Sequence, residues 1–223
     1  MDRTILRSAV TKLLSGFFMM ALLLFLPAGT FSYWNAWLLM AVLFFPMVIL
    51  GTYLLAKNPE LLRKRLRTKE VEPQQRKVIA WSAVMFLTGF PAAGFSFRFC
   101  FWMLPRWVSV LSAGVFLLGY GLYARVMQEN AYLSRTVEVQ EGQKVIDTGL
   151  YGIVRHPMYT STVLLFCSMP LVLGSALAFL CFLPYPWLLK KRIENEEAVL
   201  TAGLPGYGAY KQRVKYRMFP YLW

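Results

Sequence analysis

The sequence predicts an all-α protein that crosses a membrane several times. Of its residues, 57% are hydrophobic and 16% are charged, whereas soluble domains carry about 25% charged residues. The apolar residues come in blocks, and several blocks reach the roughly 20 residues that a helix needs to cross a bilayer. The mean hydropathy of +0.47 agrees with this pattern. We therefore expect a polytopic helical membrane protein with five to six apolar segments.

The first four apolar segments are each long enough for one span. They cover about residues 13–31, 34–56, 78–97 and 107–127. Basic residues precede the first segment, which we interpret as a retained signal anchor because no small-residue cleavage site follows it. The connection to the second segment holds Tyr33, Trp34 and Trp37, which suit the aromatic belt of a membrane interface.

The last apolar stretch, residues 158–189, is too long for one straight span, which takes about 17–25 residues. Pro170 and Gly174 interrupt it. We therefore expect a hairpin of two helices, at about 158–172 and 175–193. This gives six apolar segments, with five true spans as the alternative.

The basic residues are distributed asymmetrically. Lys and Arg number 24, and the net charge is +13. If the N-terminus is cytosolic, Arg98 and Arg106 face outward and the other basic residues lie at the cytosolic face, as the positive-inside rule requires. The polar segments 57–77, 128–157 and 190–223 then share the cytosolic side. A basic membrane face explains the charge, so we do not expect a nucleic-acid partner.

The segment 57–77 begins with the signals of a basic helix. Asn58 is a good N-cap, and Pro59 suits the first helical position. Leu55, Leu62 and Leu66 recur at helical spacing among basic residues. This pattern indicates a helix on an anionic membrane surface, and a solvated charge run that only fixes topology is an equal alternative.

The segment 128–157 is the longest polar stretch between apolar blocks. Its part "TVEVQEGQKVIDTG" alternates apolar and polar residues on either side of Glu141-Gly142, which permits a small hairpin. A polar excursion of about 30 residues is too long for a simple connector, so we expect it to carry function.

The stretch "YGIVRHPMY" contains the single histidine of the chain. Pro157 suits the first turn of a helix, and His156 then lies in its cap region. The free N–H groups and the dipole of this helix start, together with Arg155, favour an anion. Tyr151 and Tyr159 offer aromatic faces that attract a cation such as a sulfonium. A purely structural role at the membrane interface is equally compatible.

The stretch "KKRIENEEAVL" directly follows the last apolar segment. On a helix, Lys190–Glu194 and Arg192–Glu196 form pairs of opposite charge one turn apart. Glu197 has no basic neighbour at that spacing, so its carboxylate is the better candidate for binding a ligand. In the alternative, all three glutamates only solvate the helix end.

The tail "YGAYKQRVKYRMFPYLW" places Arg213 and Arg217 one turn apart, with Tyr207 and Tyr210 nearby. It can anchor the chain at the membrane interface. It can equally close over a pocket that the other two clusters build.

Together these motifs resemble the isoprenylcysteine carboxyl methyltransferase family, whose wider group includes integral-membrane phospholipid methyltransferases. The resemblance rests on "GLYGIVRHPMY", on the glutamate pair about 35 residues later, and on the tail pattern "Y..Y..RV...R..P". It covers about residues 125–223. An upstream pattern also resembles the sequences of bacterial members, and it consists of Asn130, Ser134, Val137 and Gln140. We therefore expect the chain to divide into two parts. Residues 1–124 hold the N-terminal transmembrane helices and the basic linker 57–77, and residues 125–223 form the methyltransferase core.

The resemblance implies S-adenosylmethionine as the cofactor, held in a pocket that the C-terminal half forms at the cytosolic face. It implies a lipophilic acceptor, either a small molecule, a lipid or a prenylated substrate. By position, the cofactor residues are Gly149, Tyr151, Arg155, His156, Pro157, Tyr159, Glu196 and Glu197. Glu197, Arg213 and Arg217 are the candidate catalytic residues. An arginine would orient an acceptor carboxylate, and a glutamate would serve an acceptor amine.

Two alternatives remain open at this stage. The membrane sterol and steroid reductases are similar in architecture and use a nicotinamide cofactor. A membrane adaptor whose basic face binds anionic lipid would need no catalytic residues. We expect no metal site, because one histidine and the dispersed Cys100, Cys167 and Cys181 lack ligand spacing.

Overall fold

The computed structural model describes residues 3–66, 72–134 and 136–223. Within these ranges the chain forms nine α-helices and one short 3-10 helix. They are α1 (Arg3–Ala28), α2 (Trp34–Lys57), α3 (Pro59–Leu66), α4 (Pro73–Arg98), α5 (Arg106–Glu129), η1 (Gly149–Gly152), α6 (Pro157–Val172), α7 (Ala176–Phe182), α8 (Tyr185–Gly203) and α9 (Tyr207–Arg213). The described residues hold one isolated β-bridge and no strand. The predicted all-α class is confirmed.

Four helices, α1, α2, α4 and α5, are long and apolar enough to cross a membrane. They correspond to the first four predicted segments. The helix α6 is apolar but has only 16 residues. The protein is therefore a multi-pass membrane protein with four candidate spans and a shorter apolar helix, which is fewer full-length spans than we expected.

The last apolar stretch forms the predicted hairpin, but its second arm is broken. After α6, Gly174 takes a left-handed conformation (φ 68°) that glycine adopts readily. Ser175 then caps α7, because its Oγ accepts a backbone N–H of the first turn at 3.0 Å. The expectation of one helix over 175–193 is wrong: Pro184 lacks the N–H that would continue α7, and α8 begins directly after it.

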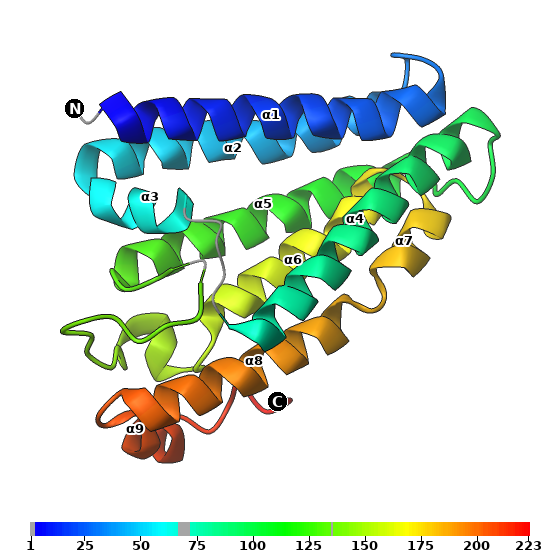
Figure 1. Ribbon diagram of the computed structural model, residues 1–223. Coiled ribbons are helices and arrows are strands. Elements are labelled where there is room, and N and C mark those ends of the chain that lie inside the picture. The colour runs from blue at the N-terminus through cyan, green and yellow to red at the C-terminus, as the bar shows by residue number, and fades with distance from the viewer. Residues whose placement is uncertain (1–2, 67–71, 135) are drawn as a thin grey trace.

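The helices pack in pairs (Figure 1). The helices α1 and α2 run side by side, α5 and α6 form a second pair, and α4 packs on α1, α7 and α8. Close packing of α5 on α6 depends on Gly119, where a Cβ would lie 2.9 Å from the Cβ of Leu164. Small residues at such crossings let membrane helices approach backbone to backbone.

Buried hydrogen bonds tie the tip of the hairpin to other helices. The Tyr33 hydroxyl donates to the Leu173 carbonyl at 2.6 Å. The Asn35 Nδ2 donates to Ser109 Oγ at 2.8 Å and to the Val172 carbonyl at 3.0 Å. Because polar groups buried among apolar helices are costly unless they are bonded, these contacts fix the tip of the hairpin against α2 and α5.

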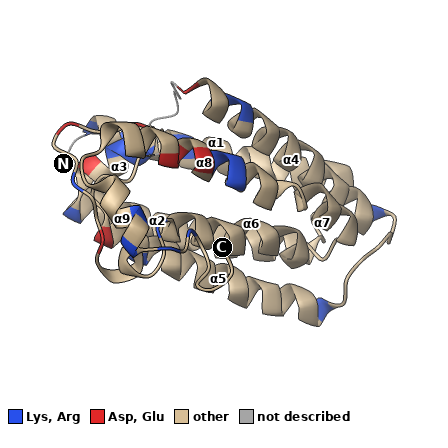
Figure 2. Ribbon diagram, turned by 90° about the horizontal axis from the view of Figure 1, so that it is seen from below, with Lys and Arg blue, Asp and Glu red and all other residues tan. Residues whose placement is uncertain are grey.

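The charged residues gather at the other end of the bundle, around α3, α8 and α9 (Figure 2). At the hairpin-tip end, α4 ends at Arg98 and α5 begins at Arg106. The predicted asymmetry of Lys and Arg is therefore present along the bundle.

The basic helix α3 begins as predicted but packs differently. Asn58 caps it, because its Oδ1 accepts the Leu61 N–H at 3.1 Å. Contrary to the expectation of a membrane-facing apolar stripe, Leu61 and Leu62 are buried against the end of α5 and η1. The helix therefore packs on the protein itself. The following residues 67–71 of the predicted segment lie outside the described residues.

Candidate active site

The end of the loop between α5 and α6 is held rigidly. Gly149 begins η1 at φ 58°, and a Cβ at this position would lie 2.6 Å from a carboxylate oxygen of Glu129. The same carboxylate accepts the Leu150 N–H at 2.8 Å. The Tyr151 carbonyl accepts the Tyr210 hydroxyl at 2.8 Å. These bonds fix η1 between α5 and α9.

The earlier part of this loop is irregular. Gly142 turns the chain at φ 68°, and the Gln140 Nε2 donates to the Tyr132 carbonyl at 2.6 Å. The flanking described residues form no strand ladder, so the hairpin that the sequence permitted does not form.

The helix α6 begins directly after His156, which occupies the cap position as predicted. The His156 ring makes no capping bond, and its Nε2 lies 3.2 Å from Glu197 Oε1. The backbone N–H groups of Arg155 and His156 donate to the carbonyls of Tyr216 and Arg217 at 2.9 and 2.8 Å. The C-terminal tail therefore packs along the start of α6.

Glu197 is the centre of a buried charge cluster, with 3% of the residue exposed. Its Oε1 accepts Arg155 Nε at 2.7 Å, and its Oε2 accepts Arg217 Nη2 at 3.1 Å. Lys211 Nζ lies 3.8 Å from the same Oε2. The expectation that this carboxylate stays unpartnered for a ligand is wrong, because its partners come from outside α8, beyond the reach of helical spacing.

Burial by itself raises the pKa of the Glu197 carboxyl. Hydrogen bonds from His156 and Arg155, and their charges, outweigh burial and hold the pKa far below its ordinary value. Glu197 is therefore an anion. Because Arg155, Arg217 and Lys211 surround it, the cluster as a whole carries a net positive charge.

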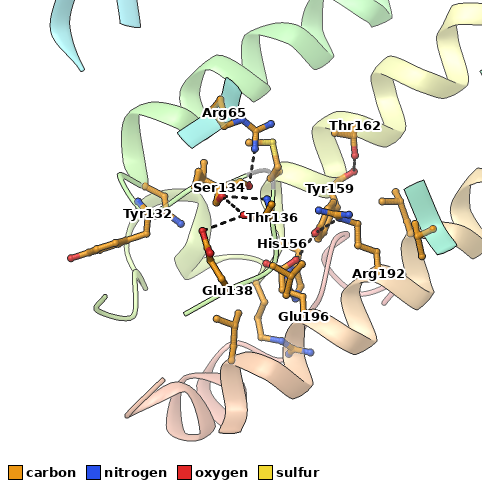
Figure 3. A pocket seen from close by; sticks show the side chains of 18 of the residues that line it. Arg65, Tyr132, Ser134, Thr136, Glu138, His156, Tyr159, Thr162, Arg192 and Glu196 are labelled. Carbon is orange, nitrogen blue, oxygen red and sulfur yellow. Dashed lines mark hydrogen bonds between the residues drawn. The ribbon is translucent and has the colours of Figure 1, made fainter. Parts of the chain in front are cut away.

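A cavity of about 490 Å³ lies beside this cluster (Figure 3). Small-molecule sites typically measure about 300–1,000 Å³. The side that we call the polar half comes from the loop after α5, the start of α6 and α8, and its polar lining residues are Asn130, Ser134, Thr136, Glu138, Tyr151, Arg155, His156 and Glu196. Leu133, Val137, Val145 and Ile146 of the same loop also line the cavity. The apolar half, from α4, α6 and α8, contains Val78, Ile79, Ala83, Phe86, Phe166, Leu188 and Leu189. Arg192 lies between the two halves, because Leu188 and Leu189 are one helical turn before it and Glu196 is one turn after it. The Tyr159 hydroxyl accepts Arg192 Nε and so lies beside it.

The middle of the chain matches a known protein family. Residues 108–202 match the model of the isoprenylcysteine carboxyl methyltransferase (ICMT) family, and this segment carries both the α6 start and the glutamate pair. The matched segment is less than half of the chain, and it is similar to the ICMT family. This match favours the methyltransferase interpretation over the reductase and adaptor alternatives.

Among solved structures, this chain is similar to the eukaryotic intramembrane Ras methyltransferase ICMT solved without a monobody. The two chains share 16% identity over 96% of this chain and 84% of the other, with a TM-score of 0.49. This similarity is too weak to transfer residue roles. No curated protein matches the chain significantly.

The cavity brings together five of the predicted cofactor residues. Tyr151, Arg155, His156, Tyr159 and Glu196 line it. The Tyr159 hydroxyl donates to Glu196 Oε2 and accepts Arg192 Nε at 2.9 Å (Figure 3). Two polar segments that flank the hairpin therefore converge on one chamber.

The other predicted residues lie behind the wall or outside it. Gly149, Pro157, Glu197, Arg213 and Arg217 do not line the cavity. Arg213 pairs with Asp147 through a largely exposed side chain. The Arg217 guanidinium binds Glu197 and lies 5.0 Å from the ring centroid of Trp223. These positions suit support of the site better than contact with a substrate.

Arg192 and Gln75 are among the residues of the wall or its support that sequence reasoning missed. Arg192 lines the cavity, and its Nη1 donates to Gln75 Oε1 at 3.0 Å. Gln75 is fully buried at the start of α4, and its Nε2 donates to the Arg192 carbonyl at 3.2 Å. The only signal for Gln75 was a polar amide at the edge of an apolar helix, and nothing local connected it to a residue 117 positions away.

One polar atom in the wall has no partner among the described residues. The Tyr207 hydroxyl is buried and unbonded, although Tyr207 lines the cavity. A buried hydroxyl without a hydrogen bond costs about 1–3 kcal/mol. A ligand in the cavity is one way to satisfy this hydroxyl.

Proposed function

We propose that this protein methylates the carboxylate of a lipophilic acceptor of the isoprenylcysteine type, inside the cavity between α4, α6, α8 and the loop after α5. One observation carries the proposal: a single cavity has a polar half beside an apolar half. The polar half suits the charged methyl donor, and the apolar half suits the hydrocarbon part of the acceptor.

The polar groups of the cavity wall fit S-adenosylmethionine, which carries a carboxylate, an amine, ribose hydroxyls and a sulfonium. Arg155 offers Nη2, which has no partner among the described residues, while Nε and Nη1 are bonded. Glu196 and Glu138 are acceptors, and the Tyr207 hydroxyl lacks a bond. The residues that would hold the cofactor are therefore Asn130, Ser134, Glu138, Tyr151, Arg155, His156, Tyr159, Glu196 and Tyr207. Gly149, Pro157 and Glu197 would support them from behind.

When bound, S-adenosylmethionine supplies a methyl group on a positively charged sulfur, which leaves as a neutral thioether. A carboxylate acceptor has no proton to lose at neutral pH. The protein therefore needs to align the two reactants and to exclude water, and alignment alone is worth about 7–11 kcal/mol.

The state of the two glutamates favours a carboxylate acceptor over an amine. A protonated amine must give a proton to a base before it attacks. Glu197 is a low-pKa anion held by Arg155 and Arg217 behind the wall. Glu196 already accepts the Tyr159 hydroxyl. Neither carboxylate is arranged as a general base.

Arg192 takes the role that the sequence assigned to Arg213 or Arg217, which is to orient the acceptor carboxylate. It lines the cavity between the apolar and polar halves, and Gln75 and Tyr159 hold its guanidinium. A guanidinium held in this way binds a carboxylate with defined geometry.

The charged end of the bundle, with the cavity, faces the cytosol in this proposal, and the N-terminus lies on the same side. Membrane lipids surround the spans. Residues 125–223 supply the polar wall, and residues 1–124 supply α4, so the two parts complete one site rather than acting as separate units.

A methylation assay tests the proposal. The protein in lipid nanodiscs is incubated with methyl-labelled S-adenosylmethionine and one of three acceptors: an N-blocked S-farnesylcysteine, its carboxamide analogue, or phosphatidylethanolamine. We expect base-labile label, released as methanol, on the first acceptor alone. Label on phosphatidylethanolamine, or equal label on the carboxamide, would overturn the carboxylate assignment. For the methyl donor, we expect the protein to bind S-adenosylhomocysteine and not to bind a nicotinamide cofactor.

A further inference from the structure

The basic helix α3 reaches the cavity from outside the segment that matches the ICMT family. That segment covers residues 108–202, whereas α3 covers Pro59–Leu66. The Arg65 Nη1 donates to the Ser134 carbonyl at 3.0 Å, and its Nη2 donates to the Tyr123 hydroxyl at 2.7 Å. One guanidinium therefore joins α3, the end of α5 and the loop after it.

A chain of hydrogen bonds leads from Ser134 along the cavity wall (Figure 3). Ser134 Oγ lies 2.8 Å from Thr136 Oγ1 and accepts the Thr136 N–H at 3.2 Å. Thr136 Oγ1 donates to Glu138 Oε1 at 3.2 Å. Ser134, Thr136 and Glu138 all line the cavity. The position of the Ser134 carbonyl thus affects how three lining side chains are presented.

This part of the loop needs an external support. Its described residues form no strand ladder and no helix, so secondary structure does not fix its carbonyl groups. The helix α3 is a firm support, because Asn58 caps it and Leu61 and Leu62 are buried beneath it. The adjacent Lys64 adds a bond from its Nζ to the Ala131 carbonyl at 3.3 Å.

The chemistry of arginine suits two acceptors at once. Its planar guanidinium holds donors in a fixed fork, whereas a lysine ammonium is a flexible point charge. Arg65 also lies over the Tyr123 ring, with Cζ 5.6 Å from the centroid, which restricts its orientation further.

We propose that Arg65 is a positioning residue for the methyl donor: through the Ser134 carbonyl and Tyr123 it holds the described loop residues 130–134 and 136–138 in the conformation that binds S-adenosylmethionine. This inference rests on the proposed function of the cavity. It assigns to the N-terminal region a part in cofactor affinity, which Arg65 exerts through the loop. The acceptor half of the cavity, built by α4, α6 and α8, does not depend on Arg65.

The test compares the full-length R65A and R65K variants with R63A, all in nanodiscs. Arg63 is on the same helix, its side chain is 61% exposed, and it pairs with Glu60. We expect R65A to raise the Kd for S-adenosylhomocysteine and the KM for S-adenosylmethionine by about 5–50-fold, the size of one to two charge-assisted bonds. The KM for the acceptor, and kcat at saturating cofactor, stay within about twofold of the wild-type values. R65K restores part of the affinity, and R63A matches the wild type.

A double-mutant cycle with Y123F gives a second readout that does not depend on R65A alone. Y123F removes the hydroxyl that accepts Arg65 Nη2, so its effect on cofactor affinity is smaller in the R65A background than in the wild type. Two results overturn the inference: unchanged cofactor affinity in R65A, or an equal loss of kcat and of affinity for both substrates with a lowered Tm. If the wild type itself does not bind S-adenosylhomocysteine, the proposed function fails and the inference falls with it.

Discussion

Arg155 Nε and Glu197 Oε1 lie 2.7 Å apart, although 42 positions separate the two residues in the chain. The pair joins the loop before the final helical hairpin to the helix after it. Because Arg155 also donates to the carbonyls of Val214 and Lys215 at 2.6 and 2.8 Å, the same guanidinium holds the C-terminal tail. The polar wall of the cavity therefore depends on one buried ion cluster.

The first prediction concerns the loss of this cluster. E197A leaves the guanidinium of Arg155 buried without its counter-ion, and breaking a buried pair in this way costs about 3–5 kcal/mol. We expect a markedly lower Tm and no cofactor binding. The control is E194A, since Glu194 is partly exposed and lies 3.9 Å from Lys190, and such surface pairs contribute about 0–1 kcal/mol. Equal Tm values for E197A and E194A would contradict the role of Glu197 as the counter-ion of the buried cluster.

The second prediction concerns pH. The pKa of the Glu197 carboxyl is lowered in the folded protein, so its stabilisation is complete above the ordinary pKa of 4.5 and is lost as the pH falls towards the folded value. The Tm difference between wild type and E197Q should therefore be largest near pH 6–7 and shrink progressively below about pH 4.5. Thermal melting at a series of pH values measures this. A constant difference from pH 7 to pH 3 would show that Glu197 acts through shape and not through charge.

Local signals in the sequence predicted the boundaries of the elements well. Asn58 caps α3, Pro157 begins α6, and Gly174 ends it, because cap and turn geometry depends on only a few neighbouring residues. The break at Pro184 was missed because the surrounding apolar pattern continues through it.

The site was predictable only in part. The loop and glutamate motifs located the two sides of the cavity, and five of their residues line it. The partners of Glu197 and Arg192 were not predictable from spacing, because they lie on α4, on the loop before α6 and in the tail. Contacts between residues far apart in the chain depend on how helices pack, which a single sequence does not specify.

The third prediction tests the tight turn before α6. G149A forces a side chain into φ 58° and places a Cβ within 2.6 Å of a Glu129 oxygen. Gly142 is the matched control, because it has a similar φ of 68° with no atom within 4 Å of its Cβ position. G142A should cost about 1–2 kcal/mol of conformational strain, and G149A clearly more, with loss of cofactor binding. Melting and binding of S-adenosylhomocysteine measure both effects.

The fourth prediction separates two neighbouring tyrosines. Y207F removes a hydroxyl without a partner among the described residues, so the stability of the free protein should stay constant or rise slightly. Cofactor affinity should fall several-fold if this hydroxyl bonds the ligand. Y210F instead removes the bond to the Tyr151 carbonyl and should lower the Tm by destabilising η1. Unchanged cofactor affinity in Y207F would exclude its hydroxyl from the binding site.

The fifth prediction tests which arginine orients the acceptor. In R192Q the positive charge between the apolar and polar halves of the cavity is lost, while the amide can still bond Gln75 or Tyr159. We expect the acceptor KM to rise about 10–100-fold, as for the loss of a charged hydrogen bond of about 1.5–3 kcal/mol, with a smaller change in the cofactor Kd. K190A is the control, since Lys190 is on the same helix with its side chain 54% exposed. If R192Q weakened cofactor binding as much as acceptor binding, Arg192 would belong to the polar half of the cavity, and the acceptor carboxylate would need another partner.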